Sequence, residues 1–202
     1  HSFPALAAYL QQVIFDLLLH YITQYLVHLT VTQNRKTLLG DYRHATAHKG
    51  HRISVNGNLN CYSFLITLLH ELAHLFTFER YANTVLAHGK EWKYEFGNIL
   101  SEFIQLKIFP DEIEKTLLST LQNPAASSCA DTRLMRVLSK YDIKKVNHFL
   151  VEQLPDNALF ATGDRRIFKK GPRIRTRYKC YEPASKKYYL FSAVYEVKLV
   201  EG

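Results

Sequence analysis

Residues 70–74 read His-Glu-Leu-Ala-His, and this stretch decides how the rest of the chain is interpreted. It lies inside an apolar segment that we expect to form a buried helix over residues 62–80. Histidines four residues apart project from one face of a helix, so both imidazoles can reach the same metal ion. Burying two histidines and a glutamate without partners would cost free energy. The stretch therefore predicts a metal centre in the protein core.

The glutamate inside this pattern predicts catalysis. Glu71 follows the first ligand and lies beside the metal, where its carboxylate can take a proton from a metal-bound water. Zinc is the expected ion, because it accepts neutral imidazole and can leave one tetrahedral position open. We therefore expect one catalytic Zn²⁺ ion, with His70 and His74 as ligands and Glu71 as the catalytic base.

A catalytic zinc site needs a third protein ligand. His88 is the best candidate, because it follows a connection long enough to turn back and precedes Gly89 at the start of another helix. Glu91 and Glu95 on that helix are the alternative, since some zinc hydrolases take a carboxylate as third ligand.

Other residues that could bind metal form weaker patterns. One loop contains His44, His48 and His51. The alternatives for this loop are a second metal site and, more simply, a polar surface loop. The cysteines Cys61, Cys129 and Cys180 are far apart and form no CxxC pair. A disulfide framework and a cysteine-rich structural zinc module are therefore not expected.

The HELAH stretch, a short connection and the sequence HGKEWK at 88–93 together resemble the SprT-like (Spartan-type) zinc metalloprotease family. Residues 38–43 and 53–56 resemble the short strands that precede its active helix. The resemblance covers about residues 1–110 well and the remainder loosely. It implies that His70, His74 and His88 hold zinc and that Glu71 is the general base. Many relatives carry a C-terminal zinc ribbon, whose partner cysteines are absent after Cys180.

We expect an α+β fold with two domains. Residues 1–144 would form a zincin-like metalloprotease domain, a helical body with a small sheet, and residues 145–202 a basic antiparallel β module that replaces the ribbon. The expected elements are a helix over 3–29, strands at 36–43 and 52–55, helices beginning near 62, 88, 111 and 131, and four or five strands after 145, the last over 188–200.

The charge of the chain is concentrated at its end. Residues 160–202 contain eleven Lys and Arg against four Asp and Glu, a net +7, whereas the whole chain has +8. Such asymmetry indicates a polyanionic partner, and we expect DNA. The expected nucleic-acid residues are Arg165, Arg166, Lys169, Lys170, Arg173, Arg175, Arg177 and Lys179. The last four alternate along one expected strand, which would place them on the same side. Tyr178, Tyr181, Tyr188 and Tyr189 could stack on bases or pack in the core.

These features predict a zinc-dependent endopeptidase that cleaves DNA-associated or DNA-crosslinked proteins, as in DNA repair. The alternatives are a non-proteolytic DNA-binding protein on the same scaffold and another zinc hydrolase. An extended substrate would pair with an exposed strand edge at 52–55. A second oxyanion donor cannot be assigned, because packing is the simpler role for Tyr62, Tyr81 and Tyr94.

The expected partners are a protein substrate and DNA, and the expected state is a monomer. We expect no membrane contact, because the apolar stretch at 3–29 is interrupted by polar residues such as Gln11, Asp16 and Gln24. That stretch also lacks the basic start and cleavage site of a signal peptide. Together with the unpaired thiols, this predicts a cytoplasmic protein of a bacterial-type cytosol or nucleoid.

Overall fold

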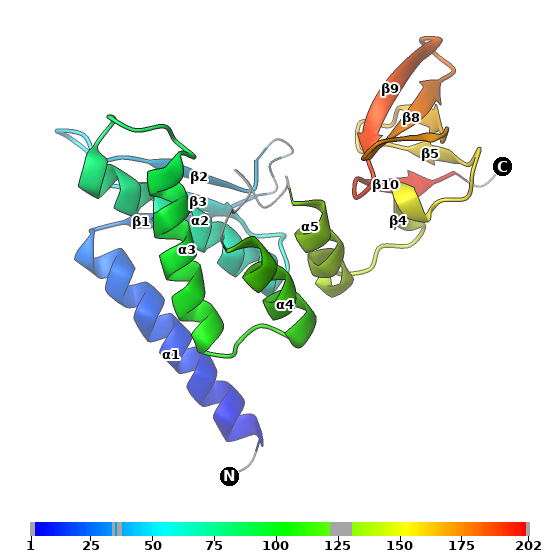
Figure 1. The fold of residues 1–202 in the computed structure, drawn as a ribbon. Helices are drawn as coiled ribbons and strands as arrows, with labels where there is room; N and C mark the ends of the chain where they lie inside the picture. Colours follow the sequence, from blue (N-terminus) through cyan, green and yellow to red (C-terminus); the bar gives the residue numbers. More distant parts are fainter. Residues whose placement is uncertain (1–2, 34, 36–37, 122–130, 201–202) are drawn as a thin grey trace. The chain divides into compact units, whose positions relative to one another are not determined.

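The computed structural model describes residues 3–33, 35, 38–121 and 131–200 and has an α+β fold. Contacts divide the chain into two compact units, His1–Asp142 and Ile143–Gly202, which are here called unit 1 and unit 2 (Figure 1). The observed boundary lies between Asp142 and Ile143, two residues before the boundary expected between residues 144 and 145. Cys129 lies outside the described residues.

Unit 1 contains a three-stranded sheet with the order β1-β3-β2, formed by β1 (His28–Thr32), β2 (Gly40–Arg43) and β3 (Arg52–Asn56). β1 is parallel to β3, and β2 is antiparallel to it. The edge expected at 52–55 is therefore wrong, because β3 is the central strand and is paired on both sides. The edge strand on the side of β2 begins at Gly40.

The first strand was not expected, since its first residues were assigned to the N-terminal helix. That helix, α1, spans Phe3–Gln24 and ends before Leu26, whose φ of 50° is incompatible with a continuing right-handed helix. The five residues of β1 then pair in register with β3, from His28 opposite Arg52 to Thr32 opposite Asn56. Long-range pairing supplies backbone hydrogen bonds that no local pattern indicates.

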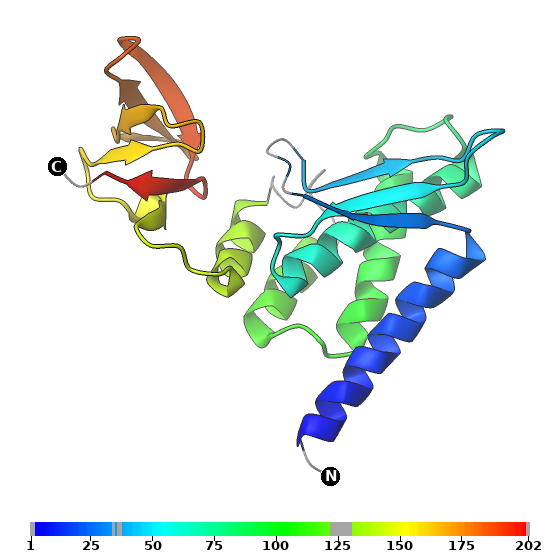
Figure 2. The same ribbon diagram turned by 180° about the vertical axis from the view of Figure 1, so that it is seen from behind.

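The helices of unit 1 lie on one side of the sheet (Figure 2). After α1 they are α2 (Cys61–Tyr81), α3 (Lys90–Gln105), α4 (Asp111–Thr120) and α5 (Thr132–Leu138), which continues into a 3₁₀ turn, η2 (Ser139–Tyr141). α2 contacts β2, β3 and α3, so it lies at the centre of the unit. Asn60 caps its N-terminus by accepting a hydrogen bond from the backbone of Ser63.

α2 also meets the length and composition that a membrane-spanning helix requires, and it is the one helix in the described part of the chain that does. Of its most apolar 18-residue window, 56% is buried inside the protein. Leu69, Leu72 and Leu75 are fully buried, as expected for a helix whose apolar surface packs within the fold.

A buried asparagine holds the chain that leads into β2. Asn56 is fully buried, and its amide donates hydrogen bonds to the backbone carbonyls of Arg35 and Leu38. The Arg35 guanidinium in turn donates to the Asn56 side chain at 2.8 Å and to Ser54 at 2.9 Å. Because buried polar groups need such partners, this network holds Leu38 against the sheet just before the edge strand.

Unit 2 is a seven-stranded antiparallel sheet with the path β4-β10-β5-β6-β8-β7, and β9 pairs with β8. Its strands are β4 (His148–Leu150), β5 (Leu159–Ala161), β6 (Ile167–Lys169), β7 (Arg173–Ile174), β8 (Arg177–Glu182), β9 (Lys187–Ser192) and β10 (Glu196–Leu199), with a 3₁₀ turn, η3 (Val151–Gln153). Seven strands replace the expected four or five, partly because a turn at Tyr195 divides the strand expected over 188–200. Phe160, Phe168 and Cys180 form the centre of its core.

Candidate metal centre and basic surface

Three imidazoles converge inside unit 1. The Nε2 atom of His70 lies 3.2 Å from Nε2 of His74 and 3.3 Å from Nε2 of His88. Nitrogens bound to one tetrahedral zinc at about 2.0–2.1 Å lie about 3.3 Å apart, so the spacing fits a shared ion. The ligand atoms of all three residues lie within 4.8 Å of one another. These histidines could therefore hold a metal ion, and the sequence placed all three correctly in one group.

This is the one group of three or more potential ligands that the described residues bring together. The alternative third ligand, Glu95, is buried but faces Arg80, with 2.9 Å between its carboxylate and the guanidinium. Glu91 also lies outside the group. In the loop with three histidines, His51 is buried against Tyr42, whereas His48 is exposed, so that loop forms no second group.

Trp92 of α3 closes the inner side of the histidine group. It is fully buried, and its ring centroid lies 4.6 Å from that of His70 and 4.7 Å from that of His88. Phe96 stacks on the other part of the indole at 5.0 Å. Trp92 thus packs in the core and also limits the imidazoles to a few orientations.

Burial keeps the three imidazoles neutral. Desolvation lowers the pKa of His70 to about 3 and that of His74 to about 4, with a further decrease from the neighbouring imidazoles. Burial also lowers the pKa of His88. Neutral imidazole is the form that binds metal, so the site needs to release few protons when an ion enters at neutral pH.

Glu71 lies between α2 and the edge strand. The residue is buried, with 6% of its surface exposed, and its carboxylate accepts a hydrogen bond from the Tyr42 backbone N–H. Desolvation, followed by the charge of Asp41, raises the pKa of Glu71 to about 8 in the metal-free protein, although Arg35 opposes this shift. A nearby divalent cation would lower that pKa again.

Gly40 makes room for this carboxylate. A Cβ atom at this position would lie 2.5 Å from Oε1 of Glu71 and 2.7 Å from Cγ2 of Thr67. Only glycine therefore allows β2 to approach the face of α2 that carries Thr67 and Glu71 so closely. The sequence did not single out Gly40, because its role depends on contact between a strand and a helix that are distant in sequence.

Tyr42 is a further residue that sequence reasoning missed. Its ring stacks parallel to His74 with 6.4 Å between centroids, and its hydroxyl lies 2.9 Å from Nδ1 of His51. His51 in turn contacts Glu79 of α2 at 3.2 Å. These contacts connect the edge strand β2 to α2, the helix that carries His70 and His74. Tyr62, Tyr81 and Tyr94, in contrast, do not line the cavity beside the histidines.

A cavity of about 560 Å³ opens beside the histidine group. One wall is β2 with Gly40, Asp41 and Tyr42, and the floor is the face of α2 that carries Glu71. The other wall is the connection between α2 and α3. The volume is within the range of small-ligand and substrate sites.

The basic residues of unit 2 do not form the single stripe expected from their alternation. Arg173 lies on β7 and Arg177 on β8, because the chain reverses at Arg175, which has φ 54°. Arg173 pairs with Tyr178, and Ile174 pairs with Arg177. Since paired residues of antiparallel strands share a face, Arg173 lies on the face opposite to Arg177. The expectation that all four charges share one side is wrong.

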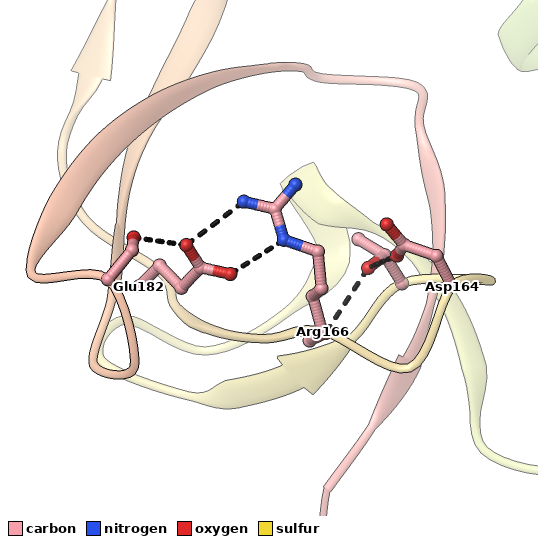
Figure 3. Close-up of polar contacts among 5 residues, drawn as sticks. Asp164, Arg166 and Glu182 are labelled. Atoms are coloured by element: carbon pink, nitrogen blue, oxygen red, sulfur yellow. Dashed lines mark hydrogen bonds and ion pairs between the residues drawn. The ribbon is translucent and has the colours of Figure 1, made fainter.

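Two of the expected nucleic-acid residues are engaged inside unit 2. The Arg166 guanidinium forms two contacts with the Glu182 carboxylate, at 2.6 and 2.9 Å (Figure 3). These contacts and the Ser185 hydroxyl hold the pKa of Glu182 at about 2. Lys170 is 4% exposed, donates to the Leu154 carbonyl at 2.5 Å and lies over the Tyr178 ring. Neither cation is free to contact a phosphate without losing these partners.

Other basic residues gather on one face of the β8–β9 hairpin. Arg177 pairs with Ser192, Lys179 with Leu190, and Tyr181 with Tyr188, so these six residues share a face, here called the outer face. The Lys179 ammonium lies 4.5 Å from the centroid of the Tyr188 ring. Of the side chains on this face, those of Tyr188 and Leu190 are 62% and 55% exposed. Tyr178 and Tyr189 instead pack in the core of the unit.

Comparison with known proteins identifies no relative. No family model matches the chain, no curated protein matches it significantly, and no solved structure does.

Removing the third histidine should abolish tight metal binding. We expect wild-type protein to bind one zinc ion and His88→Ala to lose affinity on the order of 100-fold or more, since even indirect changes at metal sites cost up to that much. Competition with a chromophoric chelator measures the zinc dissociation constants of both proteins. His48→Ala, at an exposed histidine, is the matched control and should bind as wild type. Unchanged affinity in His88→Ala would remove this residue from the site.

The metal-free protein should respond to pH in opposite senses through its histidines and Glu71. Because the pKa values of His70 and His74 are lower than the ordinary histidine value of 6.5, the unfolded state binds more protons and stability falls as pH decreases below 6.5. Because the pKa of Glu71 is raised from 4.5 to about 8, stability falls as pH rises through that window. Glu71→Gln removes only the second effect.

We therefore expect the unfolding free energy of Glu71→Gln, relative to wild type, to increase from pH 5 to pH 8 by up to ~1.4 kcal/mol per pH unit. Urea unfolding in the presence of a chelator tests this, with the fluorescence of Trp92 as reporter. It is the only tryptophan in the chain and is buried in unit 1. Parallel pH profiles for the two proteins would contradict the raised pKa.

Proposed function

We propose that the chain is a zinc-dependent endopeptidase of SprT-like type, in which unit 1 is a zincin-like catalytic domain. The single observation that carries this proposal is the convergence of His70, His74 and His88 at zinc spacing with Glu71 beside them in an open cavity. A site that only stored a structural metal would need neither the cavity nor an acid-base group. The donor set of three neutral imidazoles suits zinc and leaves a coordination position open.

When bound, zinc would supply Lewis acidity, which acidifies a coordinated water and polarises a carbonyl oxygen. The residues of the chain perform the other tasks. Glu71 accepts the proton of the attacking water at its carboxylate and returns it to the leaving amine. The Tyr42 backbone N–H holds that carboxylate toward the cavity, and Gly40 leaves it the space to move.

The edge strand β2 is the surface along which an extended peptide would bind. β2 pairs with β3 on one side only, and its residues Gly40, Asp41 and Tyr42 line the cavity. Addition of a peptide to such an edge satisfies backbone groups of both chains. We thus propose β2 as the peptide-binding edge in place of residues 52–55, which lie in the central strand of the sheet. The peptide bond would thereby lie over Glu71 and the histidines.

We further propose that unit 2 tethers the enzyme to DNA through its outer face. Arg177 and Lys179 provide charge for phosphates, Lys169 shares the face because it pairs with Tyr181, and the exposed Tyr188 provides a ring for base stacking. DNA-associated or DNA-crosslinked proteins would then be substrates, consistent with a cytoplasmic, monomeric repair protease. The net +7 of residues 160–202 favours this partner.

Proteolysis should depend on Glu71 and on DNA. We expect zinc-loaded wild type to cleave a DNA-binding protein faster when DNA is present, and Glu71→Gln to lose about 10²–10⁴-fold in rate, since this is the usual contribution of a general base. Gel analysis of cleavage, with zinc content measured for both proteins, is the test. If both proteins are equally inert while the chain still binds DNA, the non-proteolytic alternative is correct.

DNA binding should depend on where the charges lie and not only on their number. We expect Arg177→Ala/Lys179→Ala to weaken binding of a labelled oligonucleotide and to reduce the slope of log K against log salt by about 2, because two phosphate contacts are lost. Lys186→Ala/Lys187→Ala removes the same charge outside the outer face and should have a smaller effect. Fluorescence anisotropy at several salt concentrations measures both. Equal losses in the two double variants would argue against the outer face.

A further inference from the structure

The cavity beside the histidines has an apolar end that the proposed chemistry does not use. Along α2, Phe78 lies one helical turn beyond His74 on the same side, and the helix ends at Tyr81. The connection to α3 then contributes Ala82, Val85, Leu86 and Ala87, with one polar residue, Asn83, between them. We call Phe78, Ala82, Val85 and Leu86 the Phe78 subsite.

The subsite contains no charged side chain. The charged or titratable groups that line the cavity among the described residues are Asp41, Tyr42, His44 and Glu71 together with the three candidate ligands. Asp41 forms an ion pair with Arg43, and His44 lies flat on the Phe78 ring with 4.6 Å between centroids. A charged group that entered the subsite would lose water without gaining an opposite charge.

Leu86 is the most exposed large apolar residue that lines the cavity. It is 80% exposed at the lip, and the connection that carries it forms backbone hydrogen bonds at both ends. The Ala82 N–H donates to the Phe78 carbonyl at 2.7 Å, and the Gly89 N–H donates to the Leu86 carbonyl at 2.9 Å. The wall is therefore formed before any ligand binds, which reduces the entropy lost on binding.

We propose that the Phe78 subsite receives a bulky apolar side chain of the substrate, leucine or phenylalanine, adjacent to the cleaved bond. The inference rests on the proposed protease function and specifies its substrate class. A substrate side chain is the expected occupant, because the subsite and the histidine group line the same cavity. A peptide bound along β2 would pass both. Leu86 and Val85 would be buried by such a side chain and left in water by glycine.

Binding to an inactive protein tests this without relying on catalysis. Fluorescein-labelled peptides that differ only in one central residue, namely Phe, Leu, Gly, Asp or Lys, are titrated with the zinc-loaded full-length Glu71→Gln variant, and anisotropy is measured. We expect the Phe and Leu peptides to bind at least about tenfold more tightly than the others, the range that an apolar pocket provides. Equal affinities for all five would overturn the inference.

Substitution of Leu86, at the lip of the cavity, tests whether the preference for apolar peptides arises from the Phe78 subsite. Leu86→Asp, combined with Glu71→Gln, should bring the Phe and Lys peptides to within about threefold of each other. Leu118→Asp on α4, which also replaces a half-exposed leucine (47%), lies outside the cavity and should keep the wild-type preference. If Leu86→Asp keeps that preference, the subsite lies elsewhere and the inference fails.

Cleavage by the active protein separates this inference from the proposed function. Apolar preference in binding without cleavage by zinc-loaded wild type would support the subsite and overturn the protease proposal. Cleavage of all five peptides at similar kcat/KM would support the protease and overturn the subsite.

Discussion

The structure of unit 1 depends on one constraint, which is that α2 must be both the core helix and the helix that carries titratable groups. Leu69, Leu72 and Leu75 are buried as in any core helix, yet His70 and Glu71 are buried beside them. Such groups are tolerated because the imidazoles are neutral and the carboxylate accepts a backbone hydrogen bond. Trp92 then packs against the imidazoles where a charged group could not lie.

The elements around α2 follow from this constraint. β2 has to come close enough to bond Glu71, and Gly40 permits that approach. The chain before β2 is held by Asn56 and Arg35, and the Tyr42–His51–Glu79 contacts hold its far end to α2. The strand edge, Glu71 and the candidate ligands are thus positioned by shared contacts, which is the arrangement that the proposed chemistry needs.

Unit 2 shows that charge in sequence is not the same as charge available for binding. Arg166 and Lys170 stabilise the module, one through Glu182 and the other over the Tyr178 ring, and a basic pattern alone cannot separate them from exposed cations. The outer face retains Arg177 and Lys179 beside exposed aromatic and aliphatic side chains. Such a mixed face differs from an ordinary charged surface, on which large apolar side chains are scattered.

The sequence by itself determined the α+β class, the extent of α2 and the two histidines on it, His70 and His74, because helical spacing and local apolar pattern act over neighbouring residues. It also indicated His88, which lies only one connection away from α2. The parallel strand β1, the central position of β3, the space at Gly40 and the reversal at Arg175 were decided by the tertiary structure. Each of these depends on pairing or packing between segments that are separated along the chain. Strand order and face assignment have no local signature when several pairings satisfy the same pattern.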